Sequence, residues 1–508
     1  MKQQESDSRF VSQTPALPDG EKGRANTMNV PRERESMNKW AVLFVVAIGV
    51  FMATLDSSIV NISLPAIAQY FAVPLSGQVE WVIIAYLVTT AATLLTAGRL
   101  ADMVGRKIVW ICGLILFTSS SALCGLSPDL VFLIAARAVQ GIGGSLLMAV
   151  SPALLTTAFP PDERGRALGF NAVIVALGVS VGPTLGGFIT AYFSWRWIFY
   201  VNVPIGIIGV IATLSILKEH IKRNPGRFDP LGASLLAIGL ACLTAALSFG
   251  QEVGWASVII IAAFVISIIA LVLLPVVEAR VPNPVIIIAL LRNRVFSSAL
   301  LSLVLSFLAL FAVSFMLPFY LEELRNFPTE IAGLLLTPLP IMIAVVAPFS
   351  GSLADRIGTR WLASGGMAIA CIGLVCISFL NAHTSILGII WPLLVTGFGQ
   401  AIFQSPNNSA LLGAAPREHQ GSASGFLATG RVFGQSVSIA LSGAIFTGLG
   451  GALAGALLVS GKPHGQVVAL QQTFVHSFHV AFLVCAAIAV IGVFASLIRG
   501  KEAPRKVA

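Results

Sequence analysis

The chain has 508 residues, of which 56% are hydrophobic and only 10% are charged. No water-soluble domain of this size could cover its surface with so few charges, so the composition excludes a soluble fold. The formal net charge of +9 matches the anionic headgroups of lipids, and we expect no nucleic-acid partner. The solvent for most of this chain is therefore the lipid bilayer.

Apolar runs recur along the chain, and a helix needs about 20 apolar residues to cross a ~30 Å hydrocarbon core. We expect an all-α integral membrane protein. The runs predict fourteen transmembrane helices, near residues 40–64, 79–98, 108–126, 130–151, 167–191, 198–217, 230–249, 256–276, 297–321, 331–354, 361–380, 386–405, 422–448 and 478–498. Residues 1–39 are polar, do not resemble a secretory signal, and are predicted to form a disordered cytoplasmic tail.

The positions of Lys and Arg orient these helices, because cytoplasmic loops collect basic residues. Of the 31 basic residues, two lie within predicted helices, Arg137 and Arg431, and three are assigned to the outside, Arg196, Arg325 and Lys462. The rest are assigned to the cytoplasmic side. An even number of spans then places both termini in the cytoplasm. The six cysteines all fall in apolar runs, so we expect neither a disulfide framework nor a metal site.

One motif occurs twice. Gly98–Lys107 (GRLADMVGRK) lies in the predicted turn between the second and third helices, and Gly351–Arg360 (GSLADRIGTR) lies between the tenth and eleventh. The repeat indicates an internal duplication of a six-helix bundle, and the eight helices between the copies require two inserted helices. The predicted division is a bundle at 40–217, the inserted pair with its cytoplasmic linkers at 218–296, a second bundle at 297–498 and a cytoplasmic tail at 499–508.

The motif at Gly98–Lys107 resembles the signature loop of the major facilitator superfamily. Arg137–Gly144 (RAVQGIGG) is similar to the superfamily's helix-4 motif, and Gly178–Gly187 (GVSVGPTLGG) resembles the motif associated with antiporters. Leu55–Pro65 and Ser194–Pro204 look like the branch of fourteen-helix drug–proton antiporters. Together these matches cover nearly the whole chain.

The first signature loop departs from the family pattern at one position. Met103 stands where the family usually carries a basic residue, whereas the second copy keeps Arg356. We therefore expect a weaker charge network in the first loop.

The resemblance implies a proton-coupled antiporter that exports amphipathic, often cationic drugs or toxic compounds by alternating access, from the inner membrane of a bacterium. The proton gradient would supply the energy, so no cofactor is expected. The partners would be these compounds, protons and the lipid bilayer, and a periplasmic membrane-fusion adaptor stays open. The same motifs permit an exporter dedicated to one metabolite or self-made antibiotic. A membrane receptor or enzyme is the distant alternative, since the sequence shows no catalytic cluster and no phosphate-binding loop.

Asp56 is the acidic residue that lies inside an apolar run, ~24 Å from the cytoplasmic side at 1.5 Å per residue. A carboxylate at that depth is costly and marks a function or a fixed partner. We hypothesise that Asp56 carries the coupling proton; the alternative is a structural acid held by Ser57, Ser58 and the backbone. Arg137 lies at a comparable depth, ~10 Å from the outside, and could pair with Asp56. Its alternative role is to bind helix carbonyls and hold the bundle together.

Three further groups of residues are candidates for function. The signature loops are predicted to bias the conformational equilibrium between the halves, or else only to anchor the topology, through Gly98, Asp102, Gly105, Arg106, Lys107, Gly351, Asp355 and Arg356. The antiporter motif presents a smooth helix face for close packing, predicted to seal the interface between the halves, through Gly178, Gly182, Pro183, Gly186 and Gly187. Substrate contacts, or ordinary helix–helix hydrogen bonds, are predicted for Asn61, Tyr86, Gln140, Gln400, Gln404 and Asn407. Arg431 is expected to reach the cytoplasmic surface.

Overall fold

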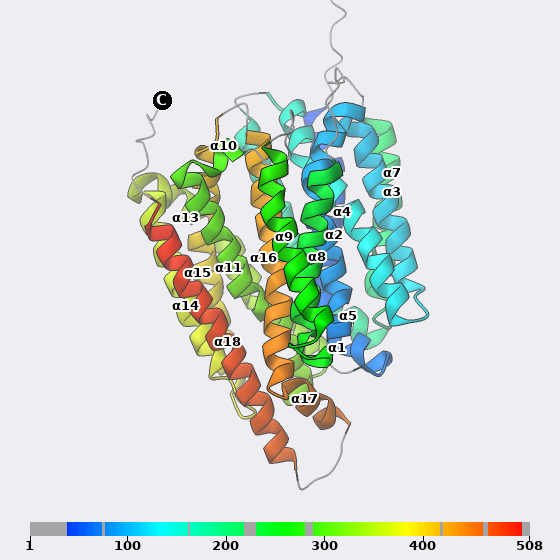
Figure 1. Cartoon of the computed structure of the whole chain (residues 1–508). Coiled ribbons are helices and arrows are strands. Elements are labelled where there is room, and N and C mark those ends of the chain that lie inside the picture. The colour runs from blue at the N-terminus through cyan, green and yellow to red at the C-terminus, as the bar shows by residue number, and fades with distance from the viewer. Residues whose placement is uncertain are drawn as a thin grey trace, which may run out of the picture. The chain divides into compact units, whose positions relative to one another are not determined.

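The computed structural model describes residues 38–73, 77–160, 163–217, 230–279, 288–416, 420–460 and 466–499. The predicted tails, apart from Asn38, Lys39 and Arg499, lie outside the described residues. In chain order the elements are α1 (Lys39–Tyr70), α2 (Gly77–Val104), α3 (Arg106–Gly125), α4 (Leu130–Ala158), α5 (Arg164–Tyr192), α6 (Trp197–Tyr200), α7 (Asn202–Ile216), α8 (Pro230–Val253), α9 (Val258–Glu278), α10 (Ile288–Leu291), α11 (Arg294–Phe319), the π-helix η1 (Tyr320–Leu324), α12 (Thr329–Leu336), α13 (Pro338–Ile357), α14 (Thr359–Ser378), α15 (Ile386–Gly413), α16 (Gln420–Gly448), α17 (Gly451–Val459) and α18 (Val467–Leu497). The all-α prediction is confirmed (Figure 1).

Apolar runs become helices here because lipid offers no hydrogen bonds to the backbone, so each peptide group must be satisfied within its own segment. Polar residues at the run ends supply the first missing acceptors. Asp129 Oδ1 accepts from the backbone N–H of Phe132 at 2.8 Å and starts α4, and Asn293 Oδ1 accepts from Val295 at 2.9 Å and starts α11. The predicted ranges of α4 and α11 therefore begin close to where these helices begin.

Twelve helices in the described part of the chain are long and apolar enough to cross a membrane, or thirteen if α16 and α17, which meet at 75°, form one broken span. The helix α2 contains a shorter apolar stretch, Gln78–Leu94. Each of the fourteen predicted ranges overlaps a helix, but the count of fourteen spans stays a prediction.

Several predicted boundaries are wrong. The helices α1, α4 and α15 continue to Tyr70, Ala158 and Gly413, beyond their predicted ends at 64, 151 and 405. The last span was expected to begin at residue 478, yet α18 begins at Val467, because the helix continues through polar residues beyond its most apolar stretch. The signature motif was expected to be a turn from Gly98 onward, yet α2 continues to Val104 and α3 begins at Arg106. The turn is Gly105 alone, which has a φ of 120°.

The second signature copy has the same geometry. The helix α13 ends at Ile357, α14 begins at Thr359, and Gly358 between them has a φ of 95°. Both glycines hold a backbone conformation that L side chains rarely adopt. The duplicated motif therefore encodes a one-residue break between two helices.

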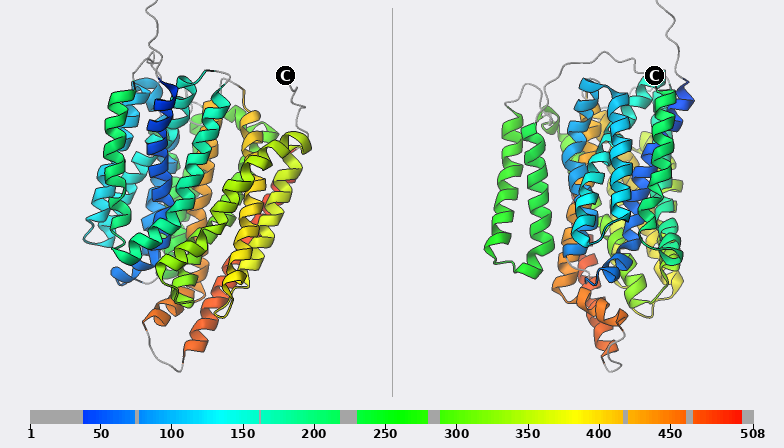
Figure 2. Two further views of the ribbon diagram at one scale, coloured as in Figure 1. Left: turned by 180° about the vertical axis from the view of Figure 1, so that it is seen from behind. Right: turned by 90° about the vertical axis from the view of Figure 1, so that its right-hand side faces the viewer.

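The helices pack in neighbouring groups, with α1 against α5, α2 against α4, and α14 against α15 and α18. The helices α2 and α16 also pack together. The pair α8 and α9 pack on each other, and α8 contacts α2 and α16; the right-hand view of Figure 2 shows this pair at one side of the helices. The division into two six-helix bundles and an inserted pair stays a prediction.

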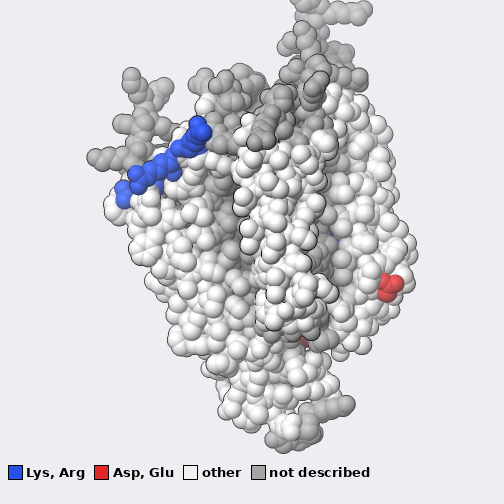
Figure 3. Space-filling view, in the orientation of Figure 1, with Lys and Arg blue, Asp and Glu red and all other residues white. Residues whose placement is uncertain are grey.

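The described surface is suited to lipid. Large apolar side chains point outward, including Val258 at 81% exposure and Leu387 at 76%. Figure 3 shows one face that is almost free of charge between its two ends, with Lys and Arg gathered near the end of the molecule where α18 ends. This pattern agrees with a multi-pass membrane protein.

We expect Gly105→Ala to destabilise the protein, because a Cβ at this positive φ costs about 1–3 kcal/mol. Gly98→Ala is the matched control, since this glycine lies seven residues earlier within α2 and a Cβ there meets nothing within 4 Å. Thermal unfolding in detergent should show a lower midpoint for Gly105→Ala and no loss for Gly98→Ala. Equal midpoints would contradict the assigned geometry.

Candidate functional site

Asp56 of α1 and Arg137 of α4 form an ion pair in the interior. Arg137 Nη1 donates to Asp56 Oδ2 at 2.6 Å, and both side chains are fully buried. The pairing that their predicted depths allowed is therefore present. A pair of charges without water needs further hydrogen bonds, because desolvation of each ion costs several kcal/mol.

Two amides supply these hydrogen bonds to the carboxylate. Gln140, one turn after Arg137, accepts from Arg137 Nη1 at 2.7 Å and donates to Asp56 Oδ1 at 2.9 Å. Asn202 at the start of α7 donates to the same Oδ1 at 2.9 Å and to Ser121 Oγ of α3 at 3.1 Å. Asp56 is thus bound by side chains from two other helices.

Aromatic and backbone groups complete the surroundings of Arg137. Its Nε donates to the carbonyl of Val82 at 2.9 Å, and its Cζ lies 4.4 Å from the ring centroid of Tyr86 and 5.7 Å from that of Phe199. A guanidinium over a desolvated ring is attracted to its π face. Arg137 therefore binds the carbonyl of Val82 as well as Asp56. Its contacts fit both roles that the sequence suggests, pairing with Asp56 and holding the helices together.

Sequence reasoning missed Asn202 and Ser121 as partners of this site. The motif Ser194–Pro204 contains Asn202, but in the sequence it indicates only a family resemblance and not a contact with Asp56. Gln140 and Tyr86 lie beside the ion pair and make contacts between helices, the alternative to a substrate contact. Their role as substrate contacts stays a prediction.

The glycines of α5 pack against the helix that carries Asp56. A Cβ at Gly178 would overlap Thr54, one at Gly182 would overlap Ser58, and one at Gly186 would lie 2.7 Å from Ile59 and Ile62. The stripe therefore lets α1 and α5 approach closely. The predicted contact with the other half does not hold for these three glycines.

The other side of α5 meets α12. A Cβ at Gly187 would lie 2.6 Å from the carbonyl of Thr329, and Gly333 packs on the carbonyl of Pro183. Thr184 and Thr337 share a hydrogen bond of 2.6 Å. Within the antiporter motif, Pro183 and Gly187 thus make the contacts to the C-terminal half.

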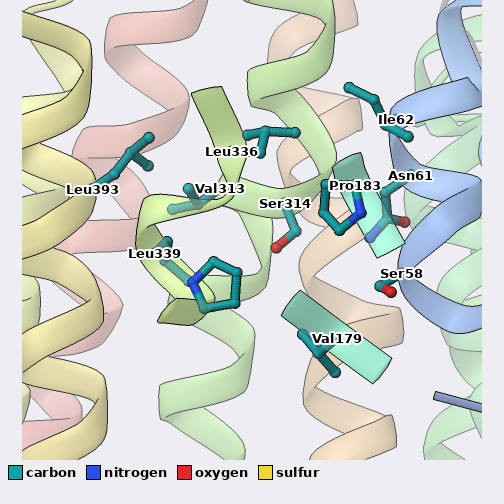
Figure 4. A pocket seen from close by; sticks show the side chains of 11 residues that line it. Ser58, Asn61, Ile62, Val179, Pro183, Val313, Ser314, Leu336, Leu339 and Leu393 are labelled. Carbon is teal, nitrogen blue, oxygen red and sulfur yellow. The ribbon is translucent and has the colours of Figure 1, made fainter. Parts of the chain in front are cut away.

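A small cavity lies beside this contact, as Figure 4 shows. Its walls come from α1, α5, α11, α12, α13 and α15 and include Ser58, Asn61, Val179, Pro183, Ser314, Leu339 and Leu393. Asn61 lines this cavity, and its Oδ1 is buried without a partner in the described part of the chain. Its role as a substrate contact stays a prediction. The cavity volume is ≈ 50 Å³, whereas drug sites measure roughly 300–1,000 Å³. The helices must separate before a drug-sized molecule fits here.

The signature-loop residues contact their own half. Arg106 Nη1 donates to the carbonyl of Ala153 at 3.0 Å and to Thr157 Oγ1 at 2.5 Å, both on α4. Lys107 donates to the carbonyls of Leu214 and Leu217 at the end of α7. Gly351 lies near Ser405 of α15, and the side chains of Asp102, Asp355 and Arg356 lie outside the described set. A switch between the halves stays a prediction.

The remaining amide candidates lie on α15. Asn407 is buried, accepts from Ser302 Oγ at 3.0 Å and donates to the carbonyl of Ala299 at 3.0 Å, and it also accepts from Arg499. These are helix–helix contacts, which was the alternative reading of this residue. Gln400 and Gln404 are half-buried, and their role as substrate contacts stays a prediction.

Comparison with known proteins identifies the family. A profile described as Major Facilitator Superfamily matches residues 46–439. This chain belongs to that superfamily. The superfamily relative "Riboflavin transporter RibZ" of Clostridioides difficile (strain 630) is 36% identical over 410 residues, covering 80% of this chain and 88% of that protein. "Multidrug resistance protein Stp" of Mycobacterium tuberculosis (strain CDC 1551 / Oshkosh) is 32% identical over 412 residues, covering 80% and 76%.

Solved structures agree with the superfamily fold. The crystal structure of a bacterial homolog to the human lysosomal transporter Spinster, in an inward-facing and unoccupied conformation, has a TM-score of 0.64 and covers 91% of this chain and 96% of that chain. At 16% identity this likeness concerns the fold alone. As a member of the Major Facilitator Superfamily, the chain is a transporter and not an enzyme.

We expect Gly182→Ala to impair transport, because the added Cβ overlaps Ser58 and overpacking of this kind costs about 1–3 kcal/mol. The double variant Ser58→Gly, Gly182→Ala removes the overlapping atoms and should recover part of the activity. Gly365→Ala on α14 is the control, since a Cβ there meets nothing within 4 Å. Efflux from whole cells measures the effect, and a double variant no better than the single one would rule out the α1–α5 contact as the cause.

We expect Asn202→Ala to reduce the transport rate, because Asp56 and Ser121 each lose a donor, and an unpaired buried group costs about 1–3 kcal/mol. Asn408→Ala is the control for loss of an amide, since its Oδ1 is buried without a partner among the described residues. Initial efflux rates at equal protein levels measure both variants. Equal rates would show that Asn202 does not support the ion pair.

Proposed function

We propose that this transporter is a proton-coupled antiporter that exports amphipathic drugs or other toxic compounds by alternating access. It would act in the cytoplasmic membrane of a bacterium, with both termini in the cytoplasm. The observation that carries the proposal is the fully buried Asp56–Arg137 pair with its two amide donors. The likeness to "Multidrug resistance protein Stp" supports the class of substrate. The cationic charge expected of many substrates rests on the sequence resemblance alone.

The chemistry of the pair suits proton coupling. A proton that binds Asp56 cancels its charge, so the attraction that holds Arg137 against α1 is lost and Gln140 and Asn202 lose a charged acceptor. The carboxyl can then take a proton when the cavity opens to one side and release it on the other.

The packing around Asp56 offers a route from the proton to the conformational change. The helix α1 contacts the glycines of α5, and α5 contacts α12 in the C-terminal half. The loop residues Arg106 and Lys107 tie the start of α3 to α4 and α7 at the cytoplasmic end. These contacts would supply the few kcal/mol by which one conformation of a two-state transporter is stabilised relative to the other.

A second candidate function is an exporter dedicated to one metabolite. The match that favours it is the 36% identity to a protein named as a riboflavin transporter. Susceptibility to dyes, quaternary ammonium compounds and antibiotics in a pump-deficient host, together with flavin export, separates the two. A broad resistance pattern supports the multidrug exporter, and export of one compound without resistance supports the dedicated one.

The decisive variant is Asp56→Asn in proteoliposomes, with drug-dependent proton movement as the measurement. We expect the unaltered transporter to move protons when drug is added and Asp56→Asn to move none, because the amide cannot carry the proton. Drug accumulation against a gradient by Asp56→Asn would contradict the proposal.

Asp56→Asn leaves Arg137 without its counter-ion, and loss of one partner of a buried pair costs about 3–5 kcal/mol. The double variant Asp56→Asn, Arg137→Gln removes both charges and serves as the control for folding. Counterflow of labelled drug, which needs no net proton movement, should persist in the double variant. Loss of counterflow together with proton movement would assign the pair to folding instead of coupling.

A further inference from the structure

One polar stripe of the helix α16 contains an arginine. Its members are separated by seven, four, three and four residues, which places them on one helix face at 3.6 residues per turn; they are Ser424, Arg431, Gln435, Ser438 and Ser442. The opposite face carries apolar residues such as Ala440 together with smaller polar ones, Ser422, Thr429, Ser436 and Thr447. The stripe is therefore the face of this helix that carries a charge.

The glycines of α16 show where the stripe points. Gly430 and Gly434 pack on α11, and a Cβ at Gly443 would overlap Glu80 of α2. The stripe lies on the helix face between these two contacts. Since α2 comes before the inserted pair and α11 after it, the stripe borders the space between the two halves.

Arg431 on this stripe has no counter-ion among the described residues. Its Nε is buried without a hydrogen-bond partner in the part of the chain that the structure describes, and the side chain is only half-buried. Eleven residues separate it from Gln420 at the start of α16, about 17 Å along the axis, which is further than one arginine side chain extends. Arg431 therefore does not reach the start of α16, and its predicted reach to the cytoplasmic surface stays a prediction.

The neighbours of Arg431 leave its charge uncompensated. Asp56 and Arg137 cancel each other, and the nearest described carboxyl along α16, Glu80, lies beside Gly443, about 18 Å further along the helix. Arg431 interacts electrostatically with the phenol of Tyr86. This phenol is neutral near pH 7 and does not balance the charge of the arginine. A lone charge within the membrane normally marks a water-filled pathway or a substrate site.

Two further groups on the stripe are ready to bind a ligand. Ser438 Oγ is buried without a hydrogen-bond partner in the described part of the chain, and Gln435 is half-buried. Exposure falls along the stripe, from the half-buried Ser424 and Arg431 to the buried Ser438 and Ser442. The stripe is therefore more accessible toward the start of α16 and closed at Ser438.

We propose that Arg431, with Gln435 and Ser438, recognises an acidic group on the substrate, so that the transporter prefers amphipathic organic anions to organic cations. The guanidinium offers paired N–H donors that fit a carboxylate, and its charge repels a quaternary ammonium group. The proposal rests on the proposed export function and corrects the cationic substrates that the resemblance implies.

The test uses the full chain in proteoliposomes with two probes of opposite charge, fluorescein and ethidium. We expect a lower KM for fluorescein than for ethidium. Arg431→Gln should raise the KM for fluorescein about tenfold, which corresponds to ~1.4 kcal/mol, and leave that for ethidium unchanged or lower. Arg431→Lys, which keeps the charge, should retain most of the fluorescein uptake.

Arg196→Gln is the matched control, because this arginine binds Tyr70 and the carbonyl of Ser127 away from α16. Equal losses for both probes in Arg431→Gln, or an unchanged KM for fluorescein, would overturn the proposal. Stabilisation of the purified protein by fluorescein, measured as a shift in unfolding temperature, tests Arg431 without any proton gradient. If Arg431→Gln abolishes this shift, the anion site is supported even when proton-driven uptake fails. Failure of proton-driven uptake would count against the antiporter and not against the anion site.

Discussion

The ion pair between Asp56 and Arg137 constrains the arrangement of the N-terminal helices. Two charges are stable in a water-free interior when fixed partners meet most of their lone pairs and protons. Here the partners come from α1, α4 and α7, with Ser121 of α3 behind Asn202, while Arg137 Nη2 has no partner among the described residues. Four helices therefore meet at one hydrogen-bonded cluster, and the strength of its hydrogen bonds depends on the charge of Asp56. Protonation of that group changes the interaction energy of all four at once.

The helix α5 connects this point to the C-terminal half. One of its sides carries the glycines that admit α1, and the other carries Pro183, Thr184 and Gly187 against α12. A shift of α1 by even a fraction of an ångström cannot be absorbed at the glycine contacts, because packed helices are not continuously deformable. The antiporter motif thus combines two functions on two faces of one helix, close packing within a half and contact between halves.

The charges of the interior have separate roles in this picture. Arg137 is matched by a carboxylate in the proposed proton-coupling site, whereas Arg431 lies on the polar stripe of α16 without such a match among the described residues. An unmatched cation is stable in a membrane only where water or a ligand reaches it. A proton site with balanced charge and a substrate wall with excess positive charge would let one transporter bind its two cargoes by different interactions.

The sequence by itself determined the membrane class, the helix positions and the depth of Asp56, because a segment in lipid must satisfy its backbone internally and its apolar length is read locally. The helix α2 exceeded its predicted end because Arg99 and Asp102 were read as loop, although a helix continues into the interface. Only the tertiary structure decided the partners. Asn202 lies 146 residues from Asp56, the glycine stripe faces α1, and Arg431 faces the space between α2 and α11. Each of these depends on how a helix is rotated about its axis against its neighbours, and an almost uniformly apolar run carries too weak a pattern to specify that rotation.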